Sequence, residues 1–161
     1  MDLHSLPAAV RRHPSATFGV VGGLFALAYL LAASDGPVDD RLPVGPEAFL
    51  VVGGFLGGAL VSWALWGRLG AADSPRRGAA AGALVGLLAL PVPFYLLELG
   101  VIAFEGSLFD PGPGSSPLAR AAEHLFLLVG TPLLLGAFGL VVTCGGTVVA
   151  GAAAGYLLAR R

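Results

Sequence analysis

Residues 125–159 read LFLLVGTPLLLGAFGLVVTCGGTVVAGAAAGYLLA and are followed at once by Arg160 and Arg161. The stretch carries no charged side chain over about 35 residues, whereas about 20 helical residues cross the hydrocarbon core of a bilayer. A soluble domain in a chain of 161 residues has no use for so long a run. The stretch therefore predicts a helix embedded in a membrane.

Small residues recur at every fourth position of this stretch and would share one face of a continuous helix. They are Gly139, Thr143, Thr147, Gly151 and Gly155. A face of small residues lets a second backbone approach closely, and this is how helices associate in lipid. We expect this face to contact another helix.

The composition of the whole chain agrees with a membrane protein. Hydrophobic residues make up 56% and charged residues 12% of the sequence, whereas about 25% of the residues of a soluble domain are charged. The net charge of −1 offers no electrostatic support for a nucleic-acid partner. A single cysteine, Cys144, excludes a disulfide within the chain. The sequence has no Gly-Lys-Ser, Gly-x-Ser-x-Gly, His-Glu-x-x-His or Cys-x-x-Cys motif, so we expect no enzyme, no cofactor and no metal centre.

Three further apolar stretches precede the last one, at about 16–33, 48–66 and 78–104, and we place the last crossing at 132–158. The sequence thus predicts an all-α integral membrane bundle of four transmembrane helices in a single domain, 1–161. An alternative for the first stretch is a twin-arginine export signal, because Arg11 and Arg12 precede it. We favour a retained helix, since its apolar run is longer than that of a signal.

The first three crossings also contain small residues spaced by four, which we expect to form packing faces. These are Gly19 and Gly23 in the first crossing, Gly53 and Gly57 in the second, and Gly78, Gly82 and Gly86 in the third. Pro91 and Pro93 then interrupt the third crossing. Because each proline removes a backbone donor and displaces a carbonyl, we expect a kink near residues 88–93.

The segment 117–130 has a different pattern. Ser116 and Pro117 form a typical helix start, with serine as N-cap and proline at the first helical position. Polar residues Arg120, Glu123 and His124 share one face of the predicted helix. This pattern favours a short interfacial helix, or one bent into the last crossing.

A turn at residues 143–146 would divide the final run into two crossings. The second of these would have only about 13 residues, which is too short for the hydrocarbon core. We therefore expect one uninterrupted last helix.

The arginines predict the orientation, because cytoplasmic flanks are enriched in basic residues. With four crossings, seven arginines fall on one side and two on the other. The first set is Arg11, Arg12, Arg68, Arg76, Arg77, Arg160 and Arg161, and the second is Arg41 and Arg120. We expect a protein of the cell membrane with both termini in the cytoplasm.

The candidate ion or proton site consists of Glu98, Glu123, His124 and Arg120 near the outer side. Glu98 is the only charged residue within a predicted crossing, and an ionisable group in a membrane suggests a function. The competing interpretation, which we favour, is that Glu98 is wetted near the outer headgroups. Glu123 and His124 are adjacent and cannot point the same way on a helix, so no metal site is predicted.

The chain resembles small multi-pass membrane proteins of salt-loving archaea in its Ala/Gly/Val richness, its arginines without lysine and its Asp-Gly-Pro loop. This resemblance implies an origin and no activity. Two functions fit the sequence. The first is an interaction or accessory subunit that packs in the lipid bilayer with a second copy of itself or a larger membrane complex. The alternative is a small ion or solute permease or channel that uses the Pro91/Pro93 break and Glu98.

Overall fold

The computed structural model describes residues 12–33, 46–105 and 116–160, and the side chains of Pro46, Glu47, Phe104 and Glu105 are outside this description. The elements in chain order are α2 (Pro14–Ala33), α3 (Pro46–Leu65), the 3-10 helix η2 (Ala71–Asp73), α4 (Pro75–Leu88), α5 (Val92–Glu105), α6 (Pro117–Leu125), the π-helical segment η3 (Phe126–Gly130), α7 (Thr131–Val142) and α8 (Gly146–Ala159). The described ranges contain no strand, which confirms the all-α prediction.

Four stretches are long and apolar enough to cross a membrane. They are Pro14–Ala33, Ala48–Leu65, Pro75–Ala103 and Pro117–Val142. The predicted integral membrane bundle with four membrane-length helices is therefore confirmed.

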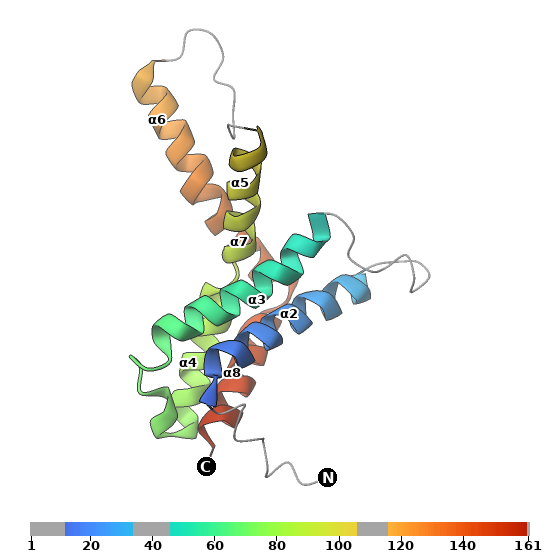
Figure 1. Cartoon of the computed structure of the whole chain (residues 1–161), viewed down its shortest axis with the longest axis vertical. Coiled ribbons are helices and arrows are strands. Elements are labelled where there is room, and N and C mark those ends of the chain that lie inside the picture. The colour runs from blue at the N-terminus through green and yellow to red at the C-terminus, as the bar shows by residue number, and fades with distance from the viewer. Residues whose placement is uncertain (1–11, 34–45, 106–115, 161) are drawn as a thin grey trace.

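The helices form a packed body from which two helices project. The antiparallel pair α2 and α3 packs beside the antiparallel pair α4 and α8 (Figure 1). These four helices are called the body below. Helices α5 and α6, called the arms, extend beyond it at the upper end of Figure 1, and α7 connects α6 back to α8.

Glycines let the backbones of α4 and α8 touch. A Cβ on Gly78 would overlap the carbonyl oxygen of Gly155, and a Cβ on Gly86 would overlap the carbonyl oxygen of Thr147. Such close approach brings many backbone atoms into van der Waals contact, the main attraction available between helices in lipid. The spacing of four in the sequence thus builds this helix pair.

Close backbone contacts at glycines also join α2 to α3. A Cβ on Gly54 would stand 2.8 Å from the carbonyl oxygen of Gly22, and a Cβ on Gly58 would overlap the carbonyl oxygen of Phe18. A Cβ on Gly19 would lie 3.0 Å from the carbonyl oxygen of Phe55. Both helix pairs of the body are therefore held by contacts between backbones.

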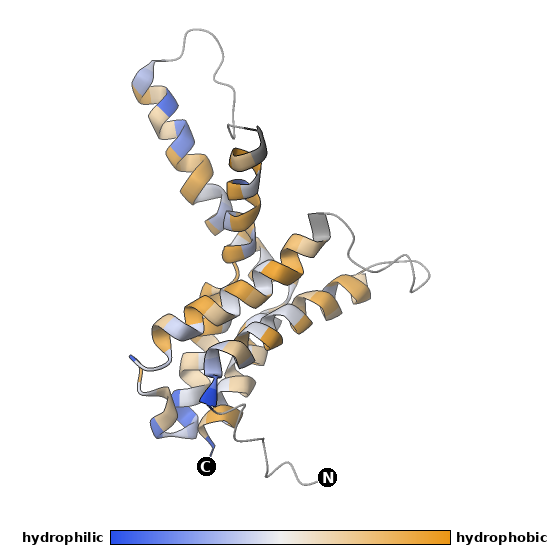
Figure 2. Ribbon diagram, in the orientation of Figure 1, coloured by the Kyte–Doolittle hydropathy of each residue, from blue (hydrophilic) through white to orange (hydrophobic). Residues whose placement is uncertain are grey.

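Side chains from three helices of the body form one buried apolar cluster. Phe18 near the start of α2, Val85 of α4 and Leu158 near the end of α8 form one buried cluster, and the ring of Trp66 packs 5.4 Å from that of Phe18. The beginning of α2 and the end of α8 thus lie at the same end of the molecule, where polar residues also gather at the lower edge of Figure 2.

Serine caps and prolines begin two of the helices. The hydroxyl oxygen of Ser74 accepts a hydrogen bond from the Arg77 N–H at 3.3 Å, ahead of Pro75. The hydroxyl oxygen of Ser116 accepts one from the Ala119 N–H at 3.2 Å, ahead of Pro117, which confirms the helix start predicted there. These caps satisfy donors that a helix leaves unpaired in its first turn.

The expected kink in the third crossing is present between α4 and α5, at residues 89–91. Glycines of the neighbouring helices make room for the displaced backbone. A Cβ on Gly57 of α3 would stand 2.9 Å from the carbonyl oxygen of Ala89, and a Cβ on Gly136 of α7 would stand 3.0 Å from the nitrogen of Pro91. The break between α4 and α5 thus packs between α3 and α7.

The expectation of one uninterrupted helix over 132–158 is wrong. Helix α7 ends at Val142 and α8 begins at Gly146, and between them Cys144 and Gly145 have φ angles of +49° and +71°. Residues in this left-handed region end a right-handed helix. The turn does not reverse the chain, because α8 runs along α4 toward the end where α2 begins (Figure 1).

The helix predicted at 117–130 is present, but it is not separated from the segment that follows it. Helix α6 continues through η3 into α7, which gives the single apolar stretch Pro117–Val142. Pro132 has no N–H to donate to the carbonyl of Leu128. The preceding turn widens, and the Thr131 N–H bonds to the carbonyl of Phe126. The segment thus joins α7 through a distorted turn, and its place at the interface or in the last crossing stays a prediction.

Candidate functional site

The residues of the predicted ion or proton site lie on the two arms, Glu98 on α5 and Arg120, Glu123 and His124 on α6. No hydrogen bond or ion pair joins any two of their side chains within the described residues. His124 Nδ1 lies 2.7 Å from the carbonyl oxygen of Arg120 in its own helix. The described part of the chain also contains no group of three His, Cys, Asp or Glu side chains placed to hold a metal ion. No direct interaction among the described residues joins these four side chains, and the ion or proton site stays a prediction.

Glu98 nevertheless stands out among them. Its side chain is half-buried, and its Oε2 atom is buried without a hydrogen-bond partner in the described structure. A carboxylate in a membrane crossing normally pairs with another group or with water. The described residues provide no partner for this oxygen.

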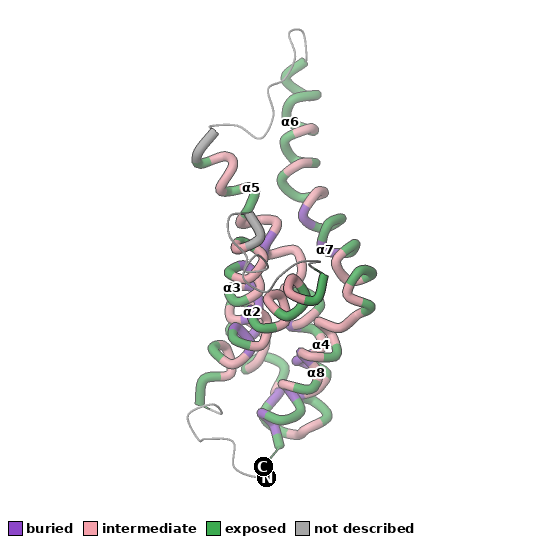
Figure 3. Tube along the Cα trace, turned by 90° about the vertical axis from the view of Figure 1, so that its right-hand side faces the viewer, coloured by how far each residue is buried: buried purple, intermediate pink, exposed green. Residues whose placement is uncertain are grey.

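The arm α6 is uncovered almost all round. Every residue of this helix is exposed except Glu123, which is half-buried (Figure 3). The exposed surface includes both its apolar face, with Leu118 and Leu125, and its polar face, with Arg120 and His124. The helix is therefore amphipathic with neither face packed against the body.

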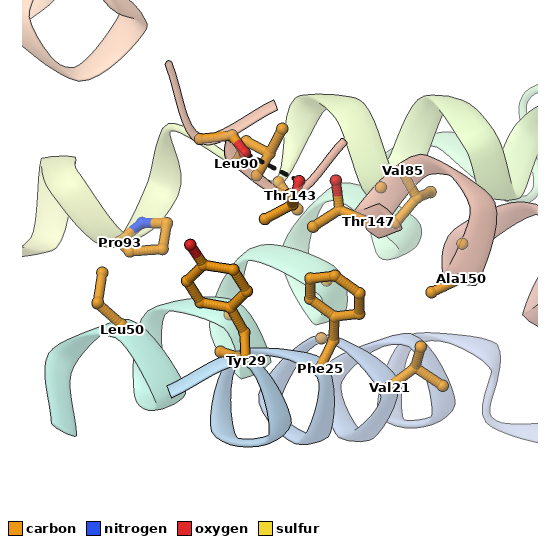
Figure 4. Close-up of a pocket in the computed structure, with 18 of the residues that line it drawn as sticks. Val21, Phe25, Tyr29, Leu50, Val85, Leu90, Pro93, Thr143, Thr147 and Ala150 are labelled. Carbon is orange, nitrogen blue, oxygen red and sulfur yellow. Dashed lines mark hydrogen bonds between the residues drawn. The ribbon is translucent and has the colours of Figure 1, made fainter. Parts of the chain in front are cut away.

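A cavity of about 190 Å³ lies where the two helix breaks meet the side of α2. In Figure 4, Phe25 and Tyr29 of α2 point toward the α4–α5 break and the α7–α8 turn. The residues that line the cavity come from six helices and both breaks: Phe18, Val21, Gly22, Phe25, Ala26, Tyr29 and Leu30 of α2; Leu50, Gly54 and Gly58 of α3; Val85, Gly86, Ala89, Leu90, Pro93 and Phe94 from α4 to α5; and Gly139, Val142, Thr143, Thr147, Ala150 and Gly151 from α7 to α8.

Three hydroxyl groups interrupt a lining that is otherwise apolar. The Thr143 hydroxyl donates to the carbonyl oxygen of Gly139 at 2.8 Å. The Thr147 Oγ1 is buried with no hydrogen-bond partner among the described residues, and the Tyr29 hydroxyl makes none with them either. The lining contains no charged side chain, and Glu98 does not belong to it.

The sequence contains a signal for the second break that we weighed incorrectly. Cys144-Gly145-Gly146 includes a Gly-Gly pair, which often marks a turn. A crossing of about 13 residues after the turn is too short only where the turn reverses the chain. This turn displaces the helix and lets the chain continue in the same direction (Figure 1).

The fold and the apolar helices define a multi-pass membrane protein. Comparisons with protein families, with curated proteins and with solved structures found no match for this chain.

Proposed function

We propose that this protein is an interaction or accessory subunit, and that its arms α5 and α6 pack against a second copy or against a larger membrane complex. The observation that carries this proposal is the exposed surface of α6, an amphipathic helix with neither face packed against the body, together with a Glu98 carboxylate oxygen that has no hydrogen-bond partner among the described residues.

Lipid accounts for only part of the arm surface. Acyl chains cover exposed leucines such as Leu99 and Leu118 without cost. They do not satisfy Glu98, which lies within the stretch Pro75–Ala103. A polar group on a neighbouring membrane helix would pair with this carboxylate and remove the cost of leaving it alone in an apolar surrounding.

The glycine faces are not available for this purpose. Gly78, Gly82 and Gly86 are occupied by α8, and Gly54 and Gly58 by α2. The close-packing surfaces that the sequence provides are thus used to hold the chain's own body together. A partner must bind elsewhere, and the arms are the part of the described structure that extends furthest from the body.

Site-specific photo-crosslinking in the native membrane tests the proposal. A photoreactive amino acid at Leu99 on α5, where the side chain is 54% exposed, is compared with one at Val149 on α8, which is 67% exposed. We expect Leu99 to give an adduct with a second polypeptide and Val149 to give lipid adducts alone. Lipid adducts alone at Leu99, with a monomer in mild detergent, would contradict the proposal.

The same proposal includes an orientation, with the end that holds Arg12, Arg68 and Arg160 in the cytoplasm. Arginines in the flanks support it: of the described arginines only Arg120 belongs to the opposite end, and Arg11, Arg41 and Arg161 lie outside the described residues. The outer ends of the arms would then face the exterior.

A second candidate function, a permease or channel, is favoured by the α7–α8 turn. Broken helices that meet near the middle of the membrane form the substrate sites of many transporters, and here two breaks line one cavity. The absence of charge from this lining favours an uncharged solute over an ion. Flux into proteoliposomes tests the idea: transport of an uncharged solute that Ala150→Phe in the cavity lining abolishes would support it, and no flux for any solute would remove this candidate.

A further inference from the structure

We infer that the cavity between the two breaks is a binding site for an uncharged, lipid-soluble molecule that carries one hydroxyl or carbonyl group. The inference concerns the body and does not depend on the role of the arms. Its starting point is the combination of an apolar lining with the buried Thr147 hydroxyl, which has no partner in the described structure, and with the Tyr29 side chain at the same cavity.

The size of the cavity suits a small organic group. A cavity of about 150 Å³ lined by aliphatic and aromatic side chains remains dry and accommodates benzene. The cavity here is larger, at about 190 Å³, and is partly open to the surface. Because it lies among membrane-crossing helices, a ligand would enter it from the lipid phase.

The lining selects against charged molecules. Among the described residues, no Arg, Asp, Glu or His lines the cavity, and an ion buried in an apolar site without a partner is strongly destabilised. An uncharged molecule avoids that cost. The aromatic rings of Phe25 and Tyr29 provide large apolar contact surfaces on the α2 side (Figure 4).

The hydroxyls of Thr147 and Tyr29 determine which polar group the ligand would carry. Buried polar groups in proteins are normally hydrogen-bonded, yet the Thr147 oxygen has no partner in the described part of the molecule. The Tyr29 hydroxyl can donate and accept, as can that of Thr147. One ligand hydroxyl or carbonyl could therefore pair with either group, while the remainder of the molecule occupies apolar space.

The test uses the full chain in detergent and three photoreactive probes of equal chain length: a long-chain alcohol, the alkane and the fatty acid. Adducts are located by peptide mass spectrometry. We expect the alcohol to label the peptides around Phe25 and Leu90 more strongly than either other probe. Excess unlabelled alcohol should suppress the signal.

Two variants and a control complete the experiment. Tyr29→Phe keeps the ring and removes the hydroxyl, and it should lower labelling by the alcohol up to about tenfold without changing labelling by the alkane. Ala150→Phe should fill the cavity and reduce labelling by both, whereas Ala153→Phe on the exposed side of α8 should not. Equal labelling by alcohol and alkane together with no effect of Tyr29→Phe, stronger labelling by the fatty acid, or a folded Ala150→Phe that labels like the parent would each overturn the inference.

Discussion

Gly82 of α4 and Gly151 of α8 face each other so closely that the carbonyl oxygen of each occupies the place where a Cβ on the other would stand. The relationship is reciprocal, and it recurs one turn away between Gly78 and Gly155. Two backbones in such contact leave no room for any side chain. Helices α4 and α8 can therefore pack in direct backbone contact only because these positions have no side chain.

The first prediction compares two substitutions of glycine by alanine. Gly82→Ala should destabilise the protein by about 1–3 kcal/mol, because the added methyl group forces the backbones of α4 and α8 apart. Gly100→Ala on α5 has open space around it, and it should be neutral or stabilise by up to about 1 kcal/mol through helix propensity. Thermal melting in detergent, followed by the fluorescence of Trp63 and Trp66, measures both. Equal melting temperatures for the two variants would contradict the packing.

The second prediction concerns the α7–α8 turn. At the positive φ of Cys144 a glycine is favoured and an alanine is strained by about 1–2 kcal/mol. Cys144→Gly should therefore be more stable than Cys144→Ala, and Gly145→Ala should lose stability although nothing lies within 4 Å of the added methyl group. A continuous helix would give the opposite order, since alanine exceeds glycine there by about 1 kcal/mol. Paired melting curves decide between the two.

The third prediction concerns Ser62, whose side chain is fully buried and whose Oγ has no hydrogen-bond partner among the described residues. Removing an unpaired buried hydroxyl should not reduce stability, so Ser62→Ala should melt at or above the temperature of the parent. Thr143→Val removes a hydroxyl that is bonded to Gly139 and should cost about 1 kcal/mol. Loss of stability in Ser62→Ala alone would show that this hydroxyl has a partner.

Much of the architecture could be predicted because the bilayer imposes simple rules. Apolar length locates the crossings, and Pro91 and Pro93 locate the first break, since proline acts through its own covalent structure. The second break could not be located in the same way. Its cause is the left-handed conformation at Cys144 and Gly145, and glycine permits that conformation without requiring it.

The candidate sites were harder to predict than the fold. Glu98 is conspicuous in the sequence, but its position relative to His124 depends on how far α5 and α6 diverge, which no local pattern encodes. The cavity depends on two breaks and on α2, which is distant in the chain from both. Tyr29 and Thr147 become notable only when the structure shows that their hydroxyls share an apolar cavity.

The topology of the last crossing tests the account most directly, because it requires that the turn at 143–145 does not reverse the chain. Single cysteines at Ser5, Ser34, Ser74, Ser115 and Arg161, in a Cys144→Gly background, are exposed to a membrane-impermeant thiol reagent in intact cells. The account predicts labelling at Ser34 and Ser115 and protection at Ser5, Ser74 and Arg161. Labelling at Arg161 together with Ser115 would show that α8 forms a separate crossing, and it would contradict the four-crossing bundle.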